Sequence, residues 1–391
     1  MQKKFLFVSP DTTPFEPSCG GIQRSNLLLR ACLKIGDVDV VTFVEGVVSN
    51  LDKCEVVYSR RIPASSNISR TRKWFGLLRP WDPYSFFPID KEREAVIDGI
   101  VSQKAYDAII VRYIPDAMSC GLMKYADRLV IDVDDHPKDK LKMTAKQAKT
   151  KPNKIYYYLA SALADVTVNS ITRKKVRATF FPNPEQVVGP RGFFLPNVPF
   201  DEPHSDLVRF DATKPRLFFV GLLDYYPNYS GLDRFVENVW PIVKRTVPNA
   251  EFHIAGKITG DVAESYRNKW NREKGVSVLG FVGDITSEYE ACRATVSPIY
   301  VGAGTNIKLV ESMQRKRDCV TTEIGMRGLK SFFESGKDVL VAKDANDFAQ
   351  LCIRALTDEG FNHHVASNAY SKVMERFSHE TFDEIVKKAL E

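Results

Sequence analysis

This sequence of 391 residues lacks several features that mark large classes of protein. No apolar run approaches the roughly 18 residues that a membrane-spanning helix needs. The seven cysteines are scattered, odd in number and contain no CxxC pair, which argues against a disulfide framework or a thiolate metal site and favours the reducing cytoplasm. A GxxxxGKS/T loop and a repeat of solenoid length are also missing, so we do not expect a Walker-type site or a repeat protein.

Charge is unevenly divided along a chain of otherwise ordinary globular composition. Residues 1–200 hold 30 Lys and Arg against 21 Asp and Glu, net +9, whereas the remainder holds 25 against 28, net −3. A basic first half indicates an anionic partner there, such as a membrane surface, a phosphorylated carrier or nucleic acid. The alternative is that the lysines only keep the protein soluble.

Short β-branched runs alternate with helical stretches, which predicts parallel sheets covered by helices on both faces. The expected strands are 5–8, 38–44, 108–111, 128–131 and 165–168, and, after the pattern restarts, 216–220, 251–255, 276–279, 294–297 and 338–341. We therefore predict an α/β chain with two doubly wound, Rossmann-like domains, residues 1–200 and 201–375, facing across a cleft. The proline-rich tract 196–215 is the expected linker. A C-terminal helix, residues 376–391, is expected to pack back on the first domain.

The segment 294–313 is the most informative one, because a predicted strand leads through a turn into a helix. The turn consists of the small residues Gly302, Ala303, Gly304 and Thr305. Its backbone N–H groups can approach an anion, and Thr305 is the expected N-cap. Lys308 lies one turn further on, and Glu311 follows on the same helix face. We predict that Lys308 binds a diphosphate and that Glu311 accepts hydrogen bonds from the ribose of a nucleotide.

Two other interpretations of this segment stay open. The turn could be a plain helix entry, with Lys308 and Glu311 as a solvated pair on the helix surface. A GxGxxG dinucleotide fingerprint is a weaker alternative, because Ile307 stands at its third glycine position.

Four landmarks follow one another between residues 217 and 356: the loop GLLDYYPN at 221–228, the stretch 240–256 that ends in Gly256, the sequence VLGFVGD at 278–284, and GAGT with Lys308 and Glu311. In this order and spacing they resemble the nucleotide-sugar-binding half of the GT-B glycosyltransferases, most of all the retaining family 4. The first half resembles that family more loosely, through Ser9-Pro10 and Gly20-Gly21.

The resemblance implies transfer of a sugar from a nucleotide-diphosphate donor to an acceptor hydroxyl, with retention of configuration and without a metal or other cofactor. It assigns Gly20 and Gly21 to the donor phosphates, Gly221 to the loop beside them, and the backbone of Phe281, Val282 and Gly283 to the base.

This chain departs from the family pattern at two places. The first carboxylate of the family's Glu-x7-Glu pair is replaced by Ala303, and residues 221–232 contain no lysine or arginine. The charge of the leaving group would then be met by Lys308, the helix N-terminus and Arg327 or Arg112. A GT-B-type sugar-nucleotide epimerase and a non-catalytic sugar-nucleotide-binding protein therefore remain alternatives.

The tract 128–136 is a predicted strand that ends in three carboxylates and a histidine. We expect Asp134 and Arg112 on the acceptor side of the site, and Asp135 and His136 as catalytic groups, with His136 as the proton carrier because its pKa is normally near neutrality. Asp132 and Asp134 could instead form a metal-binding DxD pair, and Asp134 or Asp135 could simply cap the next helix.

Two basic tracts account for the charge excess. One is Arg60-Arg61 with residues 70–79, which run into several aromatic residues, and the other is 138–154, with seven lysines. Cations beside aromatic rings suit a membrane interface or a lipid-linked acceptor. Single-stranded nucleic acid would also fit, but no RNA-binding motif accompanies the tracts. We therefore expect a glycan or lipid-linked acceptor, peripheral contact with an anionic membrane at its inner face, and no nucleic acid.

Overall fold

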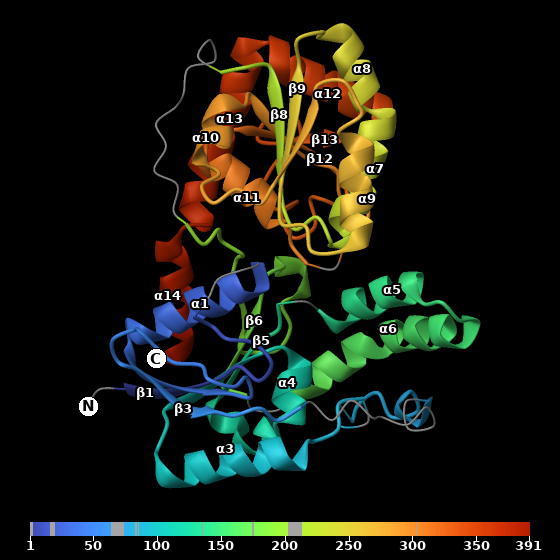
Figure 1. Cartoon of the computed structure of the whole chain (residues 1–391). Coiled ribbons are helices and arrows are strands. Elements are labelled where there is room, and N and C mark those ends of the chain that lie inside the picture. Colours follow the sequence, from blue (N-terminus) through green and yellow to red (C-terminus); the bar gives the residue numbers. More distant parts are fainter. Residues whose placement is uncertain are drawn as a thin grey trace. The chain divides into compact units, whose positions relative to one another are not determined.

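The computed structural model describes residues 3–15, 20–63, 74–82, 84, 86–134, 136–173, 176–201, 213–302 and 304–391. The chain forms two compact units, one made of Met1–Phe200 with His379–Glu391 and the other of Asp201–Ser378 (Figure 1). Most of the expected linker, residues 202–212, lies outside the described residues.

Within the described residues of the first unit, seven parallel strands form one sheet in the order β3-β2-β1-β4-β5-β6-β7. The order reverses between β1 and β4, as in doubly wound sheets. The strands are β1 (Lys3–Val8), β2 (Gly36–Thr42), β3 (Cys54–Ser59), β4 (Ala108–Arg112), β5 (Leu129–Asp132), β6 (Ala178–Phe181) and β7 (Gly192–Phe194). The helices are α1 (Gly20–Leu33), α3 (Lys91–Gln103), α4 (Ile114–Ser119), α5 (Pro137–Gln147), α6 (Lys151–Thr172) and α14 (His379–Leu390), with 3₁₀ turns η2 (Leu122–Arg128) and η3 (Pro184–Gln186).

Helix α14, the last in the chain, belongs to the first unit. The Lys3 ammonium donates to the Leu390 carbonyl at 2.8 Å, and the Arg177 guanidinium donates to the same carbonyl at 2.7 Å. An ion pair of 2.5 Å joins Lys34 and Asp383. Positive side chains at the helix C-terminus also complement its dipole.

The second unit holds six parallel strands in the order β10-β9-β8-β11-β12-β13, again counted over the described residues. The strands are β8 (Arg216–Val220), β9 (Glu251–Ala255), β10 (Val276–Gly280), β11 (Ala294–Ser297), β12 (Asp318–Thr322) and β13 (Leu340–Ala342). The helices are α7 (Tyr226–Asn238), α8 (Trp240–Thr246), α9 (Asp261–Trp270), α10 (Thr286–Ala291), α11 (Ile307–Gln314), α12 (Ala345–Thr357) and α13 (Glu359–Arg376).

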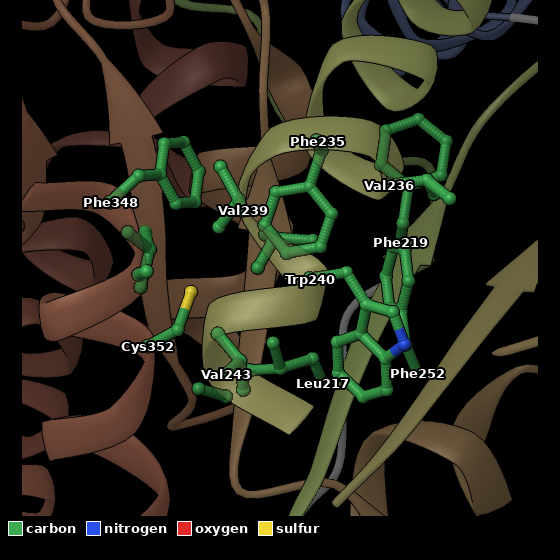
Figure 2. Close-up of a cluster of buried hydrophobic side chains, with 14 of the residues drawn as sticks. Leu217, Phe219, Phe235, Val236, Val239, Trp240, Val243, Phe252, Phe348 and Cys352 are labelled. Carbon is green, nitrogen blue, oxygen red and sulfur yellow. The ribbon is translucent and has the colours of Figure 1, made fainter. Parts of the chain in front are cut away.

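Strand β8 shows why helices cover both faces of this sheet. Its side chains alternate, so Leu217 and Phe219 join a core with α7, α8 and α12, whereas Phe218 packs against Tyr289 of α10 with ring centroids 5.1 Å apart. In the first of these cores the ring of Phe235 lies between Phe348 and Phe252 (Figure 2), at centroid distances of 5.3 and 4.9 Å.

The prediction of two doubly wound α/β halves is thus confirmed, but the strand expected at 165–168 is wrong. That stretch lies inside α6, whose buried residues include Ala164, Thr167, Val168 and Ile171. They are spaced three and four residues apart, which is the helical period, and a run as short as 165–168 cannot reveal it. Strands β3, β6, β7 and β12 were not expected.

Gly231 of α7 allows that helix to lie against the loop after β11. A Cβ at this position would come 1.8 Å from the Pro298 carbonyl oxygen, which is backbone and cannot move alone. We expect Gly231→Ala to lower the free energy of unfolding by about 1–3 kcal/mol.

Gly99→Ala in α3 is the matched control, since nothing lies within 4 Å of its Cβ. It should raise stability by about 0.5–1 kcal/mol. Urea denaturation of both variants checks this; equal effects would contradict the close approach.

Candidate active site

The carboxyl ends of β8 and β9 meet through glycines. The Gly221 N–H donates to the Ala255 carbonyl at 3.0 Å, and a Cβ on Gly256 would lie only 1.8 Å from the Gly221 carbonyl oxygen. A larger side chain at Gly256 would therefore push the two strand ends apart. Ligands of doubly wound sheets bind at this edge, and the glycines let the two strand ends approach each other there.

Lys308 is the second residue of α11 and lies beside Gly221. A Cβ on Gly221 would come 2.6 Å from Lys308 Cε and 3.0 Å from the side-chain amide nitrogen of Asn228. In the part of the chain that the structure describes, Lys308 forms no ion pair, and its ammonium lies 5.7 Å from the ring centroid of Phe219. Burial lowers the pKa of Lys308 to about 8. Glu311 opposes part of this shift, but within the described residues the Lys308 ammonium forms no ion pair with a carboxylate.

Glu311 lies one turn further along α11, partly buried, with Arg315 3.6 Å from its carboxylate. Burial raises the pKa of Glu311, while Arg315 and a hydrogen bond from Tyr289 act in the opposite direction. Arg315 in turn stacks over the ring of Tyr289, 4.7 Å from its centroid. Arg315 and Tyr289 therefore restrict the carboxylate that we assign to a ribose.

The turn before α11 differs from the expectation in its cap. Asn306, not Thr305, is the N-cap, and its side chain makes no capping hydrogen bond to the helix. It donates instead to the Ser297 hydroxyl at 2.8 Å, which keeps the backbone out of the helix for one more residue. The Arg327 guanidinium donates to the Gly302 carbonyl at 2.7 Å. Gly304 is exposed, and Ala303 lies outside the described residues.

The segment expected at the base follows β10. Phe281 is exposed, Val282 packs on the small core around Phe218, and Gly283 has nothing within 4 Å of its Cβ position. Gly280 before them has a φ of +74°, which turns the chain away from the strand.

Asn228, which lies beside Gly221, is a candidate site residue that sequence reasoning did not single out. Its side-chain nitrogen donates to the Leu222 carbonyl at 2.7 Å, and its buried side-chain oxygen has no hydrogen-bond partner. A buried amide oxygen without a partner can accept a hydrogen bond from a donor group of a ligand. The signal was available, since Asn228 ends the quoted GLLDYYPN loop, but the loop was interpreted by its glycine alone.

In the first unit, four charged residues at the ends of β4 and β5 form a buried network. Arg24 of α1 binds Asp132 through two hydrogen bonds of 2.8 and 2.7 Å, and Arg112 reaches the same carboxylate at 3.2 Å and also pairs with Asp134. Burial raises the pKa of Asp134, but Arg112 and Arg24 outweigh it and keep that pKa below its usual range. Both carboxylates of the DxD pattern, Asp132 and Asp134, thus form ion pairs with arginines. Arg112 is in turn paired with both of these carboxylates.

Gly20 and Gly21 are the first two residues of α1. The Arg112 guanidinium donates to the Gly21 carbonyl and to the Ser25 hydroxyl, the latter at 2.7 Å. A Cβ on Gly21 would lie 3.4 Å from the Tyr113 hydroxyl. The structure therefore brings Gly21, Arg112 and Asp134 together.

His136 is the N-cap of α5, a role that we had considered for its neighbours. Its Nδ1 accepts a hydrogen bond from the Lys138 N–H at 3.3 Å, and its Nε2 lies 4.0 Å from Asp165. Burial lowers the pKa of His136, although Asp165 and Asp139 oppose this shift. Asp135 lies outside the described residues. Among those described, no group of three His, Cys, Asp or Glu side chains is placed to hold a metal.

Comparisons with known proteins relate the chain to glycosyltransferases. Residues 214–358 match the family model described as glycosyl transferases group 1. An uncharacterized 44.6 kDa protein in the cps region of Klebsiella pneumoniae is 23% identical, over 98% of this chain and 99% of its own length. Among solved structures, sucrose-phosphate synthase from Thermosynechococcus elongatus superposes with a TM-score of 0.68 at 15% identity, over 99% of this chain and 98% of that one.

Anabaena HepE, solved in complex with UDP and glucose, superposes with a TM-score of 0.65 at 14% identity, covering 100% of this chain and 99% of that one. These likenesses extend over both units, whereas the family model covers the unit that holds Gly221, Lys308 and Glu311. Residues 214–358 are therefore similar to the group 1 glycosyltransferase domain, in a chain with the fold of the GT-B glycosyltransferases.

Proposed function

We propose that this protein transfers a sugar from a nucleotide-diphosphate donor to an acceptor hydroxyl, with retention of configuration. The observation that carries the proposal is the ammonium of Lys308. It is partly buried beside Gly221, unpaired by any carboxylate within the described residues, and sits in the first turn of α11. A cation at a helix N-terminus without a side-chain cap suits a diphosphate.

Lys308 and the N–H groups of α11 would stabilise the charge that grows on the departing diphosphate. Such interactions accelerate the reaction because they are stronger in the transition state than with bound donor. Glu311 would accept hydrogen bonds from the ribose hydroxyls, and the backbone of 281–283 would lie near the base. The donor phosphate itself would take the acceptor proton, so this chemistry needs neither a metal ion nor a separate nucleophile.

The donor and the acceptor are proposed by class. HepE was solved with UDP and glucose, which makes UDP-hexoses the first donors to test. A relative from a cps region supports a glycan or lipid-linked acceptor in surface polysaccharide synthesis, handled in the cytoplasm. The assignment of Gly20 and Gly21 to the donor phosphates, and of Asp134, Arg112, Asp135 and His136 to the acceptor side, stays a prediction.

Calorimetric titration with UDP-, GDP-, ADP- and dTDP-sugars tests the proposal. One of these donors should bind, and Glu311→Gln should weaken its affinity by about 10- to 100-fold, because hydrogen bonds to a charged acceptor contribute roughly 1.5–3 kcal/mol. Glu290→Gln is the matched control, since Glu290 is an exposed carboxylate on neighbouring α10.

Transfer to an acceptor must then be measured with the donor that binds. Donor consumption without any acceptor would indicate the epimerase alternative, and binding without turnover would indicate a sugar-nucleotide-binding protein. If no nucleotide sugar binds at all, the site is wrongly assigned.

A further inference from the structure

Helix α6 exposes an apolar face in addition to the one that it buries. Ile155, Tyr158, Leu159 and Val166 are all exposed, Ile155 to 54%. At 100° per residue these four side chains fall within about 100° of the helix circumference. The opposite face, with Ala164, Thr167, Val168 and Ile171, packs into the first unit. No described element covers the outer face.

A second exposed apolar segment lies beside α6. Within residues 74–82, Phe75 is 68% exposed, Leu78 67% and Trp81 62%. The Trp74 ring contacts Tyr156 of α6 with centroids 5.7 Å apart, and the Thr167 hydroxyl donates to the Pro80 carbonyl at 2.8 Å. These contacts hold the segment against α6, so its apolar side chains and those of α6 form one surface.

Lysines lie next to this surface in the stretch of chain that leads into α6, and no acidic residue stands among them along the sequence. Residues 140–164 contain no Asp or Glu. Lys140 lies over the Tyr113 ring. The other exposed lysines of this stretch, Lys142, Lys146, Lys149, Lys151 and Lys154, form no ion pair within the described residues. They lie in the second half of α5, in the turn, and in the first turn of α6, next to Ile155. We call these five lysines with Trp74, Phe75, Leu78, Trp81, Ile155, Tyr158 and Leu159 the aromatic–lysine surface.

We infer that the aromatic–lysine surface docks on an anionic lipid bilayer. Tryptophan and tyrosine favour the level of the lipid headgroups, apolar side chains insert below it, and lysines pair with anionic headgroups. No helix among the described residues is long and apolar enough to cross a membrane, so the contact is peripheral.

Two other partners fit the surface less well. A second copy of the chain would bring like-charged lysines together, since a two-fold contact pairs a patch with itself. Single-stranded nucleic acid would use aromatic rings for stacking, but Leu78, Ile155 and Leu159 offer no ring.

Cosedimentation of the full chain with vesicles tests this inference. The protein should bind vesicles of phosphatidylcholine with phosphatidylglycerol far more tightly than vesicles of phosphatidylcholine alone. The triple variant Lys142→Glu/Lys146→Glu/Lys149→Glu should reduce the partition coefficient by at least about 100-fold, since each lysine near an anionic surface contributes about fivefold. Phe75→Ser/Leu78→Ser should reduce it without changing its salt dependence. Tryptophan emission should shift to the blue on binding, because the other two tryptophans, Trp240 and Trp270, are buried.

Lys274→Glu/Lys343→Glu/Lys388→Glu is the matched control, with the same change of charge at exposed positions outside the surface. It should retain most of the binding, and thermal melting should show that all variants are folded. Equal binding by the two triple variants would overturn the inference. So would self-association, or tight binding of single-stranded RNA, that only the surface variants abolish.

Discussion

Replacing Lys308 by methionine should lower kcat for sugar transfer by about 10²–10³-fold while it raises the free energy of unfolding. The activity falls because loss of one group that stabilises transition-state charge costs roughly 2.7–4 kcal/mol. The fold gains because an ammonium with no carboxylate partner is removed from a partly buried position, and methionine keeps most of its apolar stem. A substitution that lowers activity but raises stability distinguishes a functional lysine from a structural one.

The pH dependence gives a second measurement on the same residue. Burial lowers the pKa of Lys308 from 10.5 to about 8. In the free enzyme the ammonium is therefore lost as the pH rises through about 8, so kcat/KM for the donor should fall there. A bound diphosphate favours the ammonium, so kcat should fall only at higher pH.

The lowered pKa of Lys308 also predicts how the free energy of unfolding changes with pH. Between about 8 and 10.5 the unfolded chain binds more protons at this residue than the folded chain, so the contribution of Lys308 to the free energy of unfolding rises with pH. This increment should be missing from Lys308→Met. Lys343→Met, at an exposed site, is the control and should change neither profile. Wild-type transfer by Lys308→Met would refute the assignment.

Asp132→Asn should be the most destabilising of the substitutions considered, lowering the free energy of unfolding by about 3–5 kcal/mol. The Asp132 side chain is fully buried and accepts hydrogen bonds from both Arg24 and Arg112. Asparagine keeps the shape but removes the negative charge, which leaves two buried guanidinium groups with one carboxylate, Asp134, between them. Urea denaturation measures the loss.

Asp165→Asn is the control for that experiment. Asp165 forms an ion pair with Lys138 at 2.5 Å, but both side chains are about half exposed, at 48% each. Exposed pairs contribute at most about 1 kcal/mol, so this substitution should have a small effect. A loss at Asp132 no larger than the loss at Asp165 would show that the buried network does not stabilise the first unit.

Local sequence patterns predicted the parts of the site that lie on one stretch of chain. The spacing of Lys308 and Glu311 already placed both on one face of a helix, because three residues are nearly one helical turn. The same kind of reasoning placed the helix cap one residue too early. That boundary depends on Ser297, nine residues away, which binds the Asn306 side chain.

Contacts between distant segments were beyond sequence reasoning. Arg112 was interpreted as a cation for phosphate or acceptor, yet it is bound by Asp132 and Asp134, twenty and twenty-two residues away. Asn228 and the proximity of Gly221 to Lys308 likewise join residues that no local pattern connects.

The sequence by itself determined the fold class, although it missed β3, β6, β7 and β12 and placed a strand at 165–168. The alternation of most strands with helices follows from hydrophobic period along the chain, and it also indicates the edge of the sheet where ligands bind. Only the tertiary structure decided which charges are available. Whether an arginine or a lysine meets a carboxylate depends on how strands far apart in sequence come together, and this leaves Arg112 neutralised and the Lys308 ammonium unpaired within the described residues.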